Sequence, residues 1–221
     1  MSPISVVRLL FGLAFGALLA GCGTTGPAGS NLEAFHQAAV LIEHPNGHGT
    51  GIILGPRTVL TAHHVVRQSP VQVTFFNGPV ASGQVVWQDE TLDLALVDVA
   101  VPAEYRAVEL ACADLRSGQQ LLSIGHPTQS RWVAVAGYLP STARFGGGDL
   151  VALGFPIGLG TSGGPVFDTN GRVAGVALAI LAERSSASAV FDRYKDTGIG
   201  LMLPAADFCP AIASRLDAHR L

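Results

Sequence analysis

Short apolar runs recur along residues 40–99, and each run is bounded by residues that favour turns, such as Pro45-Asn46-Gly47. Between Val71 and Phe75 apolar and polar side chains alternate, which is typical of a strand with one buried face. The pattern predicts six strands, at Val40–Glu43, Gly51–Leu54, Val59–Thr61, Val71–Phe76, Val85–Gln88 and Leu94–Val99.

A second set of short apolar runs lies between residues 121 and 203. It predicts six more strands, at Leu121–Ile124, Trp132–Tyr138, Leu150–Leu153, Val166–Phe167, Val173–Ile180 and Ile199–Leu203. After Pro204 the spacing becomes helical, with apolar residues at Ala206, Phe208, Ile212 and Leu216. The chain is therefore predicted to be all-β, with two six-stranded antiparallel barrels and a C-terminal α-helix.

These patterns also predict the domain boundaries. The folded part spans residues 38–218, and residues 101–118 show no strand pattern and form the expected linker. The expected units are an N-terminal barrel (38–100), a linker (101–118), a C-terminal barrel (119–204) and a C-terminal helix (205–218).

The first 21 residues have the pattern of a secretory signal peptide. Arg8 precedes an apolar run of 12 residues, Leu9–Ala20, whereas a membrane-spanning helix needs about 20. The small residues before Cys22 resemble the bacterial lipobox, in which the cysteine is lipidated and becomes the new N-terminus. The alternatives are an ordinary cleaved signal and a buried helix.

We therefore expect residues 22–37 to be a lipidated cysteine and a flexible tether. The predicted location is the bacterial cell envelope, with the protein attached to a membrane through Cys22. Gly23 follows the cysteine. In lipoproteins a residue other than Asp at this position usually directs the protein to the outer membrane, where it would face the periplasm.

Charge argues against a nucleic-acid partner. The chain has 13 basic and 16 acidic residues, and removal of the leader with Arg8 leaves 12 basic residues against 16 acidic, a net charge of −4. No basic patch is expected from that balance. About 200 residues remain, which is enough to bury a real core.

Three short blocks carry residues suited to nucleophilic catalysis. Residues 160–165 read Gly-Thr-Ser-Gly-Gly-Pro, which predicts a tight turn that presents the Ser162 hydroxyl and leaves backbone N–H groups unobstructed. His63 and His64 follow one expected strand, and Asp93 precedes another. Serine becomes an effective nucleophile when an imidazole accepts its proton and a carboxylate orients the imidazole. Each block alone could be structural, but together they indicate a catalytic triad.

The blocks resemble those of trypsin-like serine proteases, in the compact bacterial branch that includes the HtrA-type peptidases. Residues 61–65, Thr-Ala-His-His-Val, are similar to the family's Thr-Ala-Ala-His-Cys, which assigns the general base to His64 rather than His63. Asp93 matches the family's Asp-Leu-Ala-Leu, and Ser162 its Gly-x-Ser-Gly-Gly-Pro. The resemblance implies a serine endopeptidase that hydrolyses polypeptides through an acyl-enzyme. The N–H groups of Gly160 and Ser162 would form the oxyanion hole.

The resemblance covers residues 38 to about 218, so this whole segment is expected to be a trypsin-like peptidase domain. We expect no appended peptide-binding (PDZ) domain of the kind that HtrA enzymes carry. Thr161 stands where pancreatic relatives have an Asp that pairs with a newly freed N-terminus. That ion pair is therefore not expected here, and the site either forms on folding or is switched in another way.

The resemblance also suggests where the primary specificity pocket lies. Its base would be Pro156 or Ile157, and its walls Ala177, Leu178 and Gly200. None of these residues is charged, and a buried unpaired charge is costly. We therefore expect small or medium apolar residues at the P1 position of the substrate.

Two cysteines remain once Cys22 is lipidated. In an oxidising compartment Cys112 and Cys209 could form a disulfide, and the alternative is a pair of buried free thiols. The sequence has no Cys-x-x-Cys pair, so structural zinc is not expected. We expect neither a metal nor a cofactor.

Two other function classes fit parts of the sequence. The serine turn also satisfies the Gly-x-Ser-x-Gly pattern of α/β-hydrolases, which would make the protein an esterase using Ser162 with His219. That fold needs alternating helices, which the patterns do not predict. The second alternative is a catalytically inactive lipoprotein that uses the protease fold for binding. Oligomeric state cannot be predicted from these features.

Overall fold

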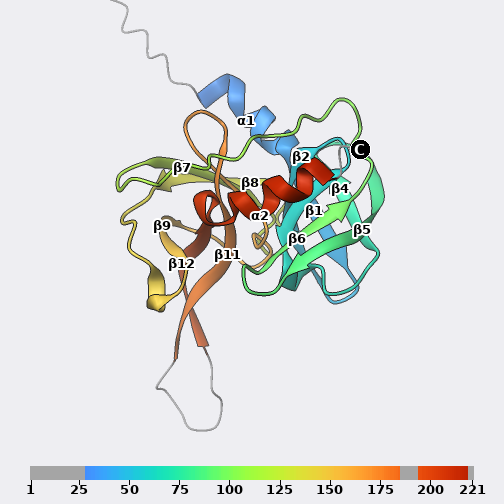
Figure 1. The fold of residues 1–221 in the computed structure, drawn as a ribbon. Helices are drawn as coiled ribbons and strands as arrows, with labels where there is room; N and C mark the ends of the chain where they lie inside the picture. Colours follow the sequence, from blue (N-terminus) through green and yellow to red (C-terminus); the bar gives the residue numbers. More distant parts are fainter. Residues whose placement is uncertain (1–27, 185–193, 219–221) are drawn as a thin grey trace, which may run out of the picture.

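A computed structural model describes residues 28–184 and 194–218. The expected signal peptide, Cys22 and His219 lie outside these residues. The first six strands form a closed antiparallel barrel in the order β1-β2-β3-β6-β5-β4 (Figure 1). They are β1 (Ala39–His44), β2 (Gly47–Gly55), β3 (Thr58–Ala62), β4 (Val71–Phe75), β5 (Val80–Asp89) and β6 (Leu94–Asp98).

The last six strands form an antiparallel sheet in the order β8-β7-β10-β11-β12-β9. They are β7 (Gln120–Gly125), β8 (Val133–Tyr138), β9 (Val151–Pro156), β10 (Pro165–Phe167), β11 (Val173–Arg184) and β12 (Tyr194–Pro204). The edge strands β8 and β9 pack against each other, since Gly154 lies directly against the Tyr138 carbonyl, and the sheet nearly closes. The predicted all-β double barrel is confirmed, with the second barrel not completely closed.

Apolar side chains fill the inside of both barrels. Val71, Val73 and Phe75 on β4 are buried, whereas Gln72 between them is exposed, as the alternation in the sequence predicted. In the second barrel Leu153 and Met202 lie in one buried cluster. Two rigid barrels thus present the loops between them in fixed positions.

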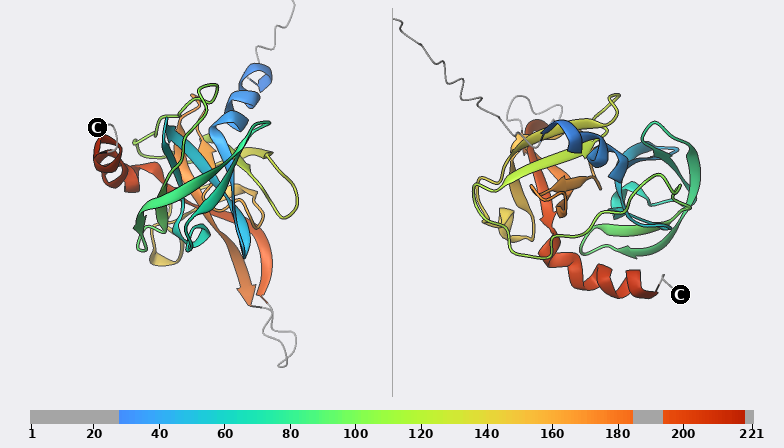
Figure 2. Two further views of the ribbon diagram at one scale, coloured as in Figure 1. Left: turned by 90° about the vertical axis from the view of Figure 1, so that its right-hand side faces the viewer. Right: turned by 90° about the horizontal axis from the view of Figure 1, so that it is seen from above.

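Two α-helices flank the barrels (Figure 2). The C-terminal helix α2 (Ala205–Ala218) lies where the sequence predicted it and buries Phe208 and Ile212. No helix in the described part of the chain is long and apolar enough to cross a membrane.

The N-terminal helix α1 (Ala28–Ala38) differs from the expectation of a flexible tether through residue 37. Phe35 packs on Phe167 with 4.8 Å between ring centroids, and His36 lies 4.9 Å from the ring of Phe76. These contacts place the C-terminal end of the helix against both barrels, where the sequence had predicted a tether without regular structure.

The esterase alternative is not supported by this fold. It requires helices alternating with parallel strands. The strands of both sheets pair antiparallel, and the described residues contain only α1 and α2 as α-helices.

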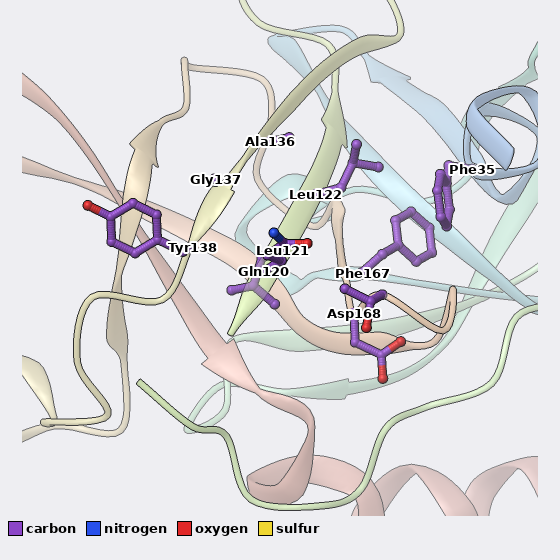
Figure 3. A pocket seen from close by; sticks show the side chains of 10 residues that line it. Phe35, Gln120, Leu121, Leu122, Ala136, Gly137, Tyr138, Phe167 and Asp168 are labelled. Atoms are coloured by element: carbon purple, nitrogen blue, oxygen red, sulfur yellow. The ribbon is translucent and has the colours of Figure 1, made fainter. Parts of the chain in front are cut away.

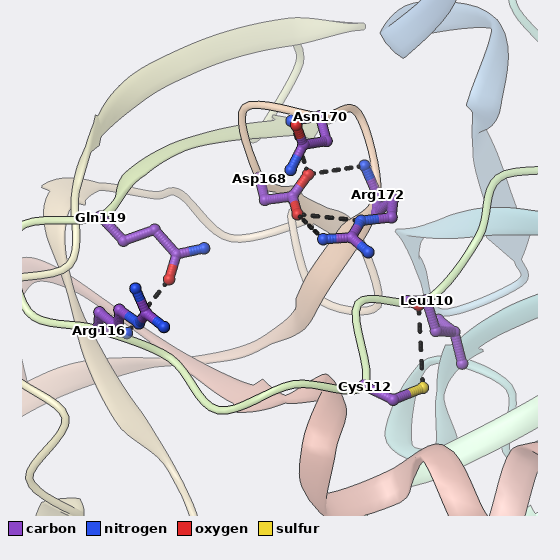
Figure 4. A network of polar contacts seen from close by, with 7 residues as sticks. All are labelled: Leu110, Cys112, Arg116, Gln119, Asp168, Asn170 and Arg172. Atoms are coloured by element: carbon purple, nitrogen blue, oxygen red, sulfur yellow. Dashed lines mark hydrogen bonds and ion pairs between the residues drawn. The ribbon is translucent and has the colours of Figure 1, made fainter.

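The segment between the barrels runs along the second barrel and reaches α2 (Figure 4). Leu110 forms an isolated bridge with Val173, and Cys112 is joined to Cys209 of α2 by a disulfide with a Cα–Cα distance of 5.8 Å. Nearby, the buried Asp168 carboxylate accepts hydrogen bonds from the Arg172 side chain and from backbone N–H groups of its own turn. The linker is therefore tied to the helix that closes the fold.

Candidate active site

His64 and Asp93 meet at the end of the first barrel. His64 lies in a short 3₁₀-helix (His63–Val65) that follows β3, and Asp93 immediately precedes β6. Because β3 and β6 pair antiparallel with Ala62 opposite Leu94, the end of one strand lies beside the start of the other. The His64 Nδ1 atom lies 2.6 Å from Asp93 Oδ2, and the His64 backbone N–H donates to Asp93 Oδ1 at 3.0 Å.

The environment of Asp93 keeps its carboxylate ionised. Burial alone would raise the pKa of Asp93, but the hydrogen bonds and charge of His64 outweigh it and lower the pKa below its usual value. An ionised carboxylate on Nδ1 favours the tautomer in which Nδ1 carries the proton and Nε2 is free to accept one. This is the state that a general base requires.

The structure distinguishes the two neighbouring histidines. The His63 backbone N–H donates to the Asp93 carbonyl at 3.0 Å, but its imidazole makes no hydrogen bond in the described structure. Only the His64 side chain is bonded to the Asp93 carboxylate. The geometry favours His64 as the partner of the aspartate.

Ser162 is presented by the turn that precedes β10 of the second barrel. Its carbonyl accepts a hydrogen bond from the Thr50 backbone N–H at 2.8 Å, which joins the turn to β2. Gly49 of β2 fits between Val65, the neighbour of His64, and the Ser162 carbonyl. Ser162 therefore lies beside the segment that carries His64, at the junction of the barrels.

The Ser162 hydroxyl does not bond to His64 in this conformation. Its Oγ atom donates to the Leu178 carbonyl at 3.3 Å. A rotation about χ1 moves the hydroxyl between staggered positions, and hydrogen bonds of this kind are often unmade in a protease without substrate. The structure thus joins His64 to Asp93 and places Ser162 nearby without closing the third contact.

The N–H groups of Gly160 and Ser162 are the free donors of the serine turn. The N–H groups of Thr161, Gly163 and Gly164 donate to the carbonyls of Gly158, Ala177 and Thr161, at 3.0, 2.7 and 2.9 Å. Within the described residues, neither the Gly160 nor the Ser162 N–H has a hydrogen-bond partner. Both remain available to an incoming oxyanion.

Sequence reasoning did not find the residues that support this turn. Thr50 on β2 donates its hydroxyl to the Gly160 carbonyl at 2.8 Å, and the Thr128 N–H donates to the Leu159 carbonyl at 2.7 Å. His48 Nε2 lies 2.8 Å from the His126 carbonyl, and both groups lie against Gly160. No local pattern in the sequence around Thr50 marks a contact with residue 160.

His126 is a buried imidazole beneath the serine turn. Burial is the main cause that lowers the pKa of His126 to about 3, and the nearby charges of Arg131 and His48 act in the same direction. Its Nδ1 accepts a hydrogen bond from the Trp132 backbone N–H at 3.1 Å. His126 is therefore neutral at physiological pH and acts as part of the packed support.

The expected specificity pocket is only partly hollow in this structure. Pro156 and Ile157 line a cavity of about 300 Å³ with residues of β7 and β8, whereas Ala177, Leu178 and Gly200 do not line it. The Ile157 side chain packs closely over Gly200, and Ala177 and Leu178 are buried. The five residues share an apolar environment, but they do not enclose one open pocket.

Two further hollows lie elsewhere on the surface. One of about 670 Å³ adjoins the histidine-aspartate pair and is lined by His63, His64, Arg67, Gln88, Glu90 and Asp93. The other, of about 490 Å³, lies between α1 and strands β7, β8 and β10, where Phe35 and Phe167 border it (Figure 3). The first borders His64 and Asp93 but not Ser162, and the second includes none of these three residues.

A double β-barrel with His64, Asp93 and Ser162 at the junction of its two halves is the arrangement of the trypsin-like fold. A family model described as a trypsin-like peptidase domain matches residues 49–176, more than half of the 221-residue chain. The chain belongs to this family.

Curated relatives include periplasmic serine proteases of bacteria. The chain is 26% identical over 168 residues to the periplasmic pH-dependent serine endoprotease DegQ of Escherichia coli K12, covering 72% of this chain and 35% of the relative. It is 28% identical over 166 residues to the periplasmic serine endoprotease DegP of Salmonella typhimurium, covering 71% of this chain and 33% of the relative. The chain spans about a third of the length of these relatives.

Solved structures share the fold. The Rv3671c protein of M. tuberculosis H37Rv superposes with a TM-score of 0.67 at 22% identity, over 84% of this chain and 89% of that chain. A serine endoprotease from Yersinia pestis gives a TM-score of 0.67 at 20% identity, over 83% of this chain and 65% of that chain. At these identities the likeness concerns the fold alone.

Proposed function

We propose that this protein is a serine endopeptidase that hydrolyses peptide bonds through an acyl-enzyme. The observation that carries the proposal is the hydrogen bond between His64 and the ionised Asp93, beside a serine whose turn offers two free N–H groups. Membership of the trypsin-like family and the serine endoproteases among its relatives support the same reaction.

Each residue has a defined role in the proposed reaction. Ser162 Oγ attacks the scissile carbonyl while His64 Nε2 accepts its proton and then gives it to the leaving amine. Asp93 orients His64 and stabilises the imidazolium without becoming protonated. The Gly160 and Ser162 N–H groups stabilise the oxyanion, and one such donor lowers the barrier by about 3 kcal/mol in measured cases.

The proposed location is the bacterial cell envelope. The names of the two curated relatives given above place those proteins in the periplasm. We propose that lipidated Cys22 anchors this protein, at the outer membrane facing the periplasm. One lipid-modified residue then places the active site near the membrane.

Covalent labelling of Ser162 tests the proposed reaction. A fluorophosphonate reacts with a serine that a neighbouring base has activated, so peptide mass analysis should find the label on Ser162. The label should be lost in His64→Ala and retained in His219→Ala. If the folded wild-type protein is not labelled, the proposal fails in favour of an inactive binding protein. Loss of the label in His219→Ala alone would also contradict it.

We further propose a preference for small or medium apolar P1 residues. The expected pocket residues Pro156, Ile157, Ala177, Leu178 and Gly200 are all uncharged, and four of them are buried. A basic side chain would be desolvated there without a partner, which is costly. In a matched series of peptide substrates, kcat/KM should be at least about tenfold higher with Ala or Val at P1 than with Arg. Efficient cleavage after Arg would contradict this preference.

A further inference from the structure

We propose that the Thr50 side chain is a positioning residue that holds the oxyanion hole open. This inference rests on the proposed function, since it concerns the reaction at Ser162. The oxyanion loop is defined here as residues 158–162. The carbonyl of Gly160 in this loop accepts the Thr50 hydroxyl at 2.8 Å, across the junction between the two barrels.

All five carbonyls of the oxyanion loop accept a hydrogen bond. Gly158 and Thr161 are bonded within the turn, by the N–H groups of Thr161 and Gly164. The Leu159 carbonyl is bonded by the Thr128 N–H at 2.7 Å. The carbonyls of Gly160 and Ser162 are both bonded by Thr50, through its hydroxyl and its N–H, each at 2.8 Å. With every carbonyl of the loop directed to a donor, no carbonyl is left to compete for the Gly160 and Ser162 N–H groups, which stay free for the oxyanion.

The bond to Gly160 fixes the peptide that separates these two N–H groups. The Gly160–Thr161 peptide lies between the peptide that carries the Gly160 N–H and the peptide that carries the Ser162 N–H. Its orientation therefore sets the angle between the two donors. Gly160 has a φ of 100°, in a region where glycine rotates with little steric cost. An external contact is needed to hold this peptide in one orientation.

Thr50 is well placed to supply that contact. It is fully buried on β2, and its backbone is fixed by pairing with β1. Of the five carbonyl contacts, the one to Gly160 is the only one made by a side chain. It can therefore be removed by a substitution that leaves the backbone bonds in place.

Thr50→Val removes the hydroxyl and keeps the shape of the side chain. Without its donor, the Gly160 carbonyl is expected to turn toward another partner and misalign the hole. The kcat for a peptide substrate should fall by about 10- to 100-fold, which is somewhat less than the loss of one oxyanion-hole N–H donor costs. KM should stay within about twofold of wild type. The rate constant for fluorophosphonate labelling of Ser162 should fall in parallel, because the phosphoryl oxygen occupies the same hole.

Two control variants distinguish a positioning role of the Thr50 hydroxyl from a general loss of stability of the first barrel. Thr50→Ser keeps the hydroxyl and should retain kcat within about threefold of wild type. Tyr105→Phe removes another hydroxyl that donates to a backbone carbonyl, that of Phe76 at 2.7 Å, at a place in the first barrel away from the serine turn. It should lower the melting temperature as much as Thr50→Val does while leaving most of kcat. If Thr50→Val does not fold, Thr50→Ala carries the same expectation.

The affinity for a peptide aldehyde gives an independent readout. The adduct of the aldehyde with Ser162 places an oxygen in the hole, so its inhibition constant should rise by the same factor as kcat/KM falls. Labelling of Thr50→Val at the wild-type rate would overturn the proposal. So would an equal loss of kcat in Tyr105→Phe, or failure of Thr50→Ser to retain the rate. If wild-type Ser162 is not labelled at all, the proposed function itself fails.

Discussion

Replacing Ser162 by alanine should lower the rate of peptide hydrolysis by about 10⁶-fold, and His64→Ala should lower it about as much, because either change removes the attack that the triad performs as a unit. Asp93→Asn should cost about 10⁴-fold, since the amide no longer holds the required tautomer of His64. Initial rates on a peptide substrate give these values. Ser162 Oγ makes a single hydrogen bond, of 3.3 Å, so the melting temperature of Ser162→Ala should change little.

His63→Ala is the matched control for these variants. His63 and His64 are adjacent, but only the backbone of His63 contacts Asp93, through an N–H that alanine retains. His63→Ala should therefore keep wild-type kcat within a few-fold. If His63→Ala is inactive and His64→Ala is active, the assignment of the general base is wrong by one position.

The strand pattern was predictable wherever one face of a strand is buried. Val71–Phe75 alternates in the sequence and forms β4, in which the odd-numbered residues are buried. The expected strand at Val85–Gln88 forms only the second half of β5, which begins at Val80. The first half pairs with β4, but several of its side chains are exposed, so hydrophobicity alone does not reveal it.

Helix α1 and the support of the serine turn were not predictable from local sequence. Phe35 of α1 is held by its contact with Phe167, a residue more than a hundred positions away in the sequence. The Thr50 hydroxyl reaches Gly160 across 110 positions. Local motifs identified the groups suited to the chemistry, because the chemistry requires particular residue types. The contacts that orient those groups depend on how two barrels pack, and only the structure supplies them.

Removing the disulfide should cause a large loss of stability without a matching loss of activity. Cys112 and Cys209 are separated by 97 positions, and cross-linking a loop of this length restricts the unfolded chain by an amount worth about 4.7 kcal/mol in the chain-entropy model. For about 200 residues this corresponds to a decrease in melting temperature of roughly 10 °C. Thermal unfolding of the wild type with and without a reductant measures the effect.

The variant Cys112→Ser/Cys209→Ala should unfold at the temperature of the reduced wild type, and a reductant should shift it no further. Helix α2 should stay docked, because Phe208 and Ile212 are buried and Asp207 is paired with Arg144. The disulfide then acts mainly on the unfolded state, and kcat at 25 °C should be unchanged. An unshifted melting temperature on reduction, or two alkylated thiols before it, would contradict this account. A loss of kcat in step with stability would instead mean that the linker positions the active site.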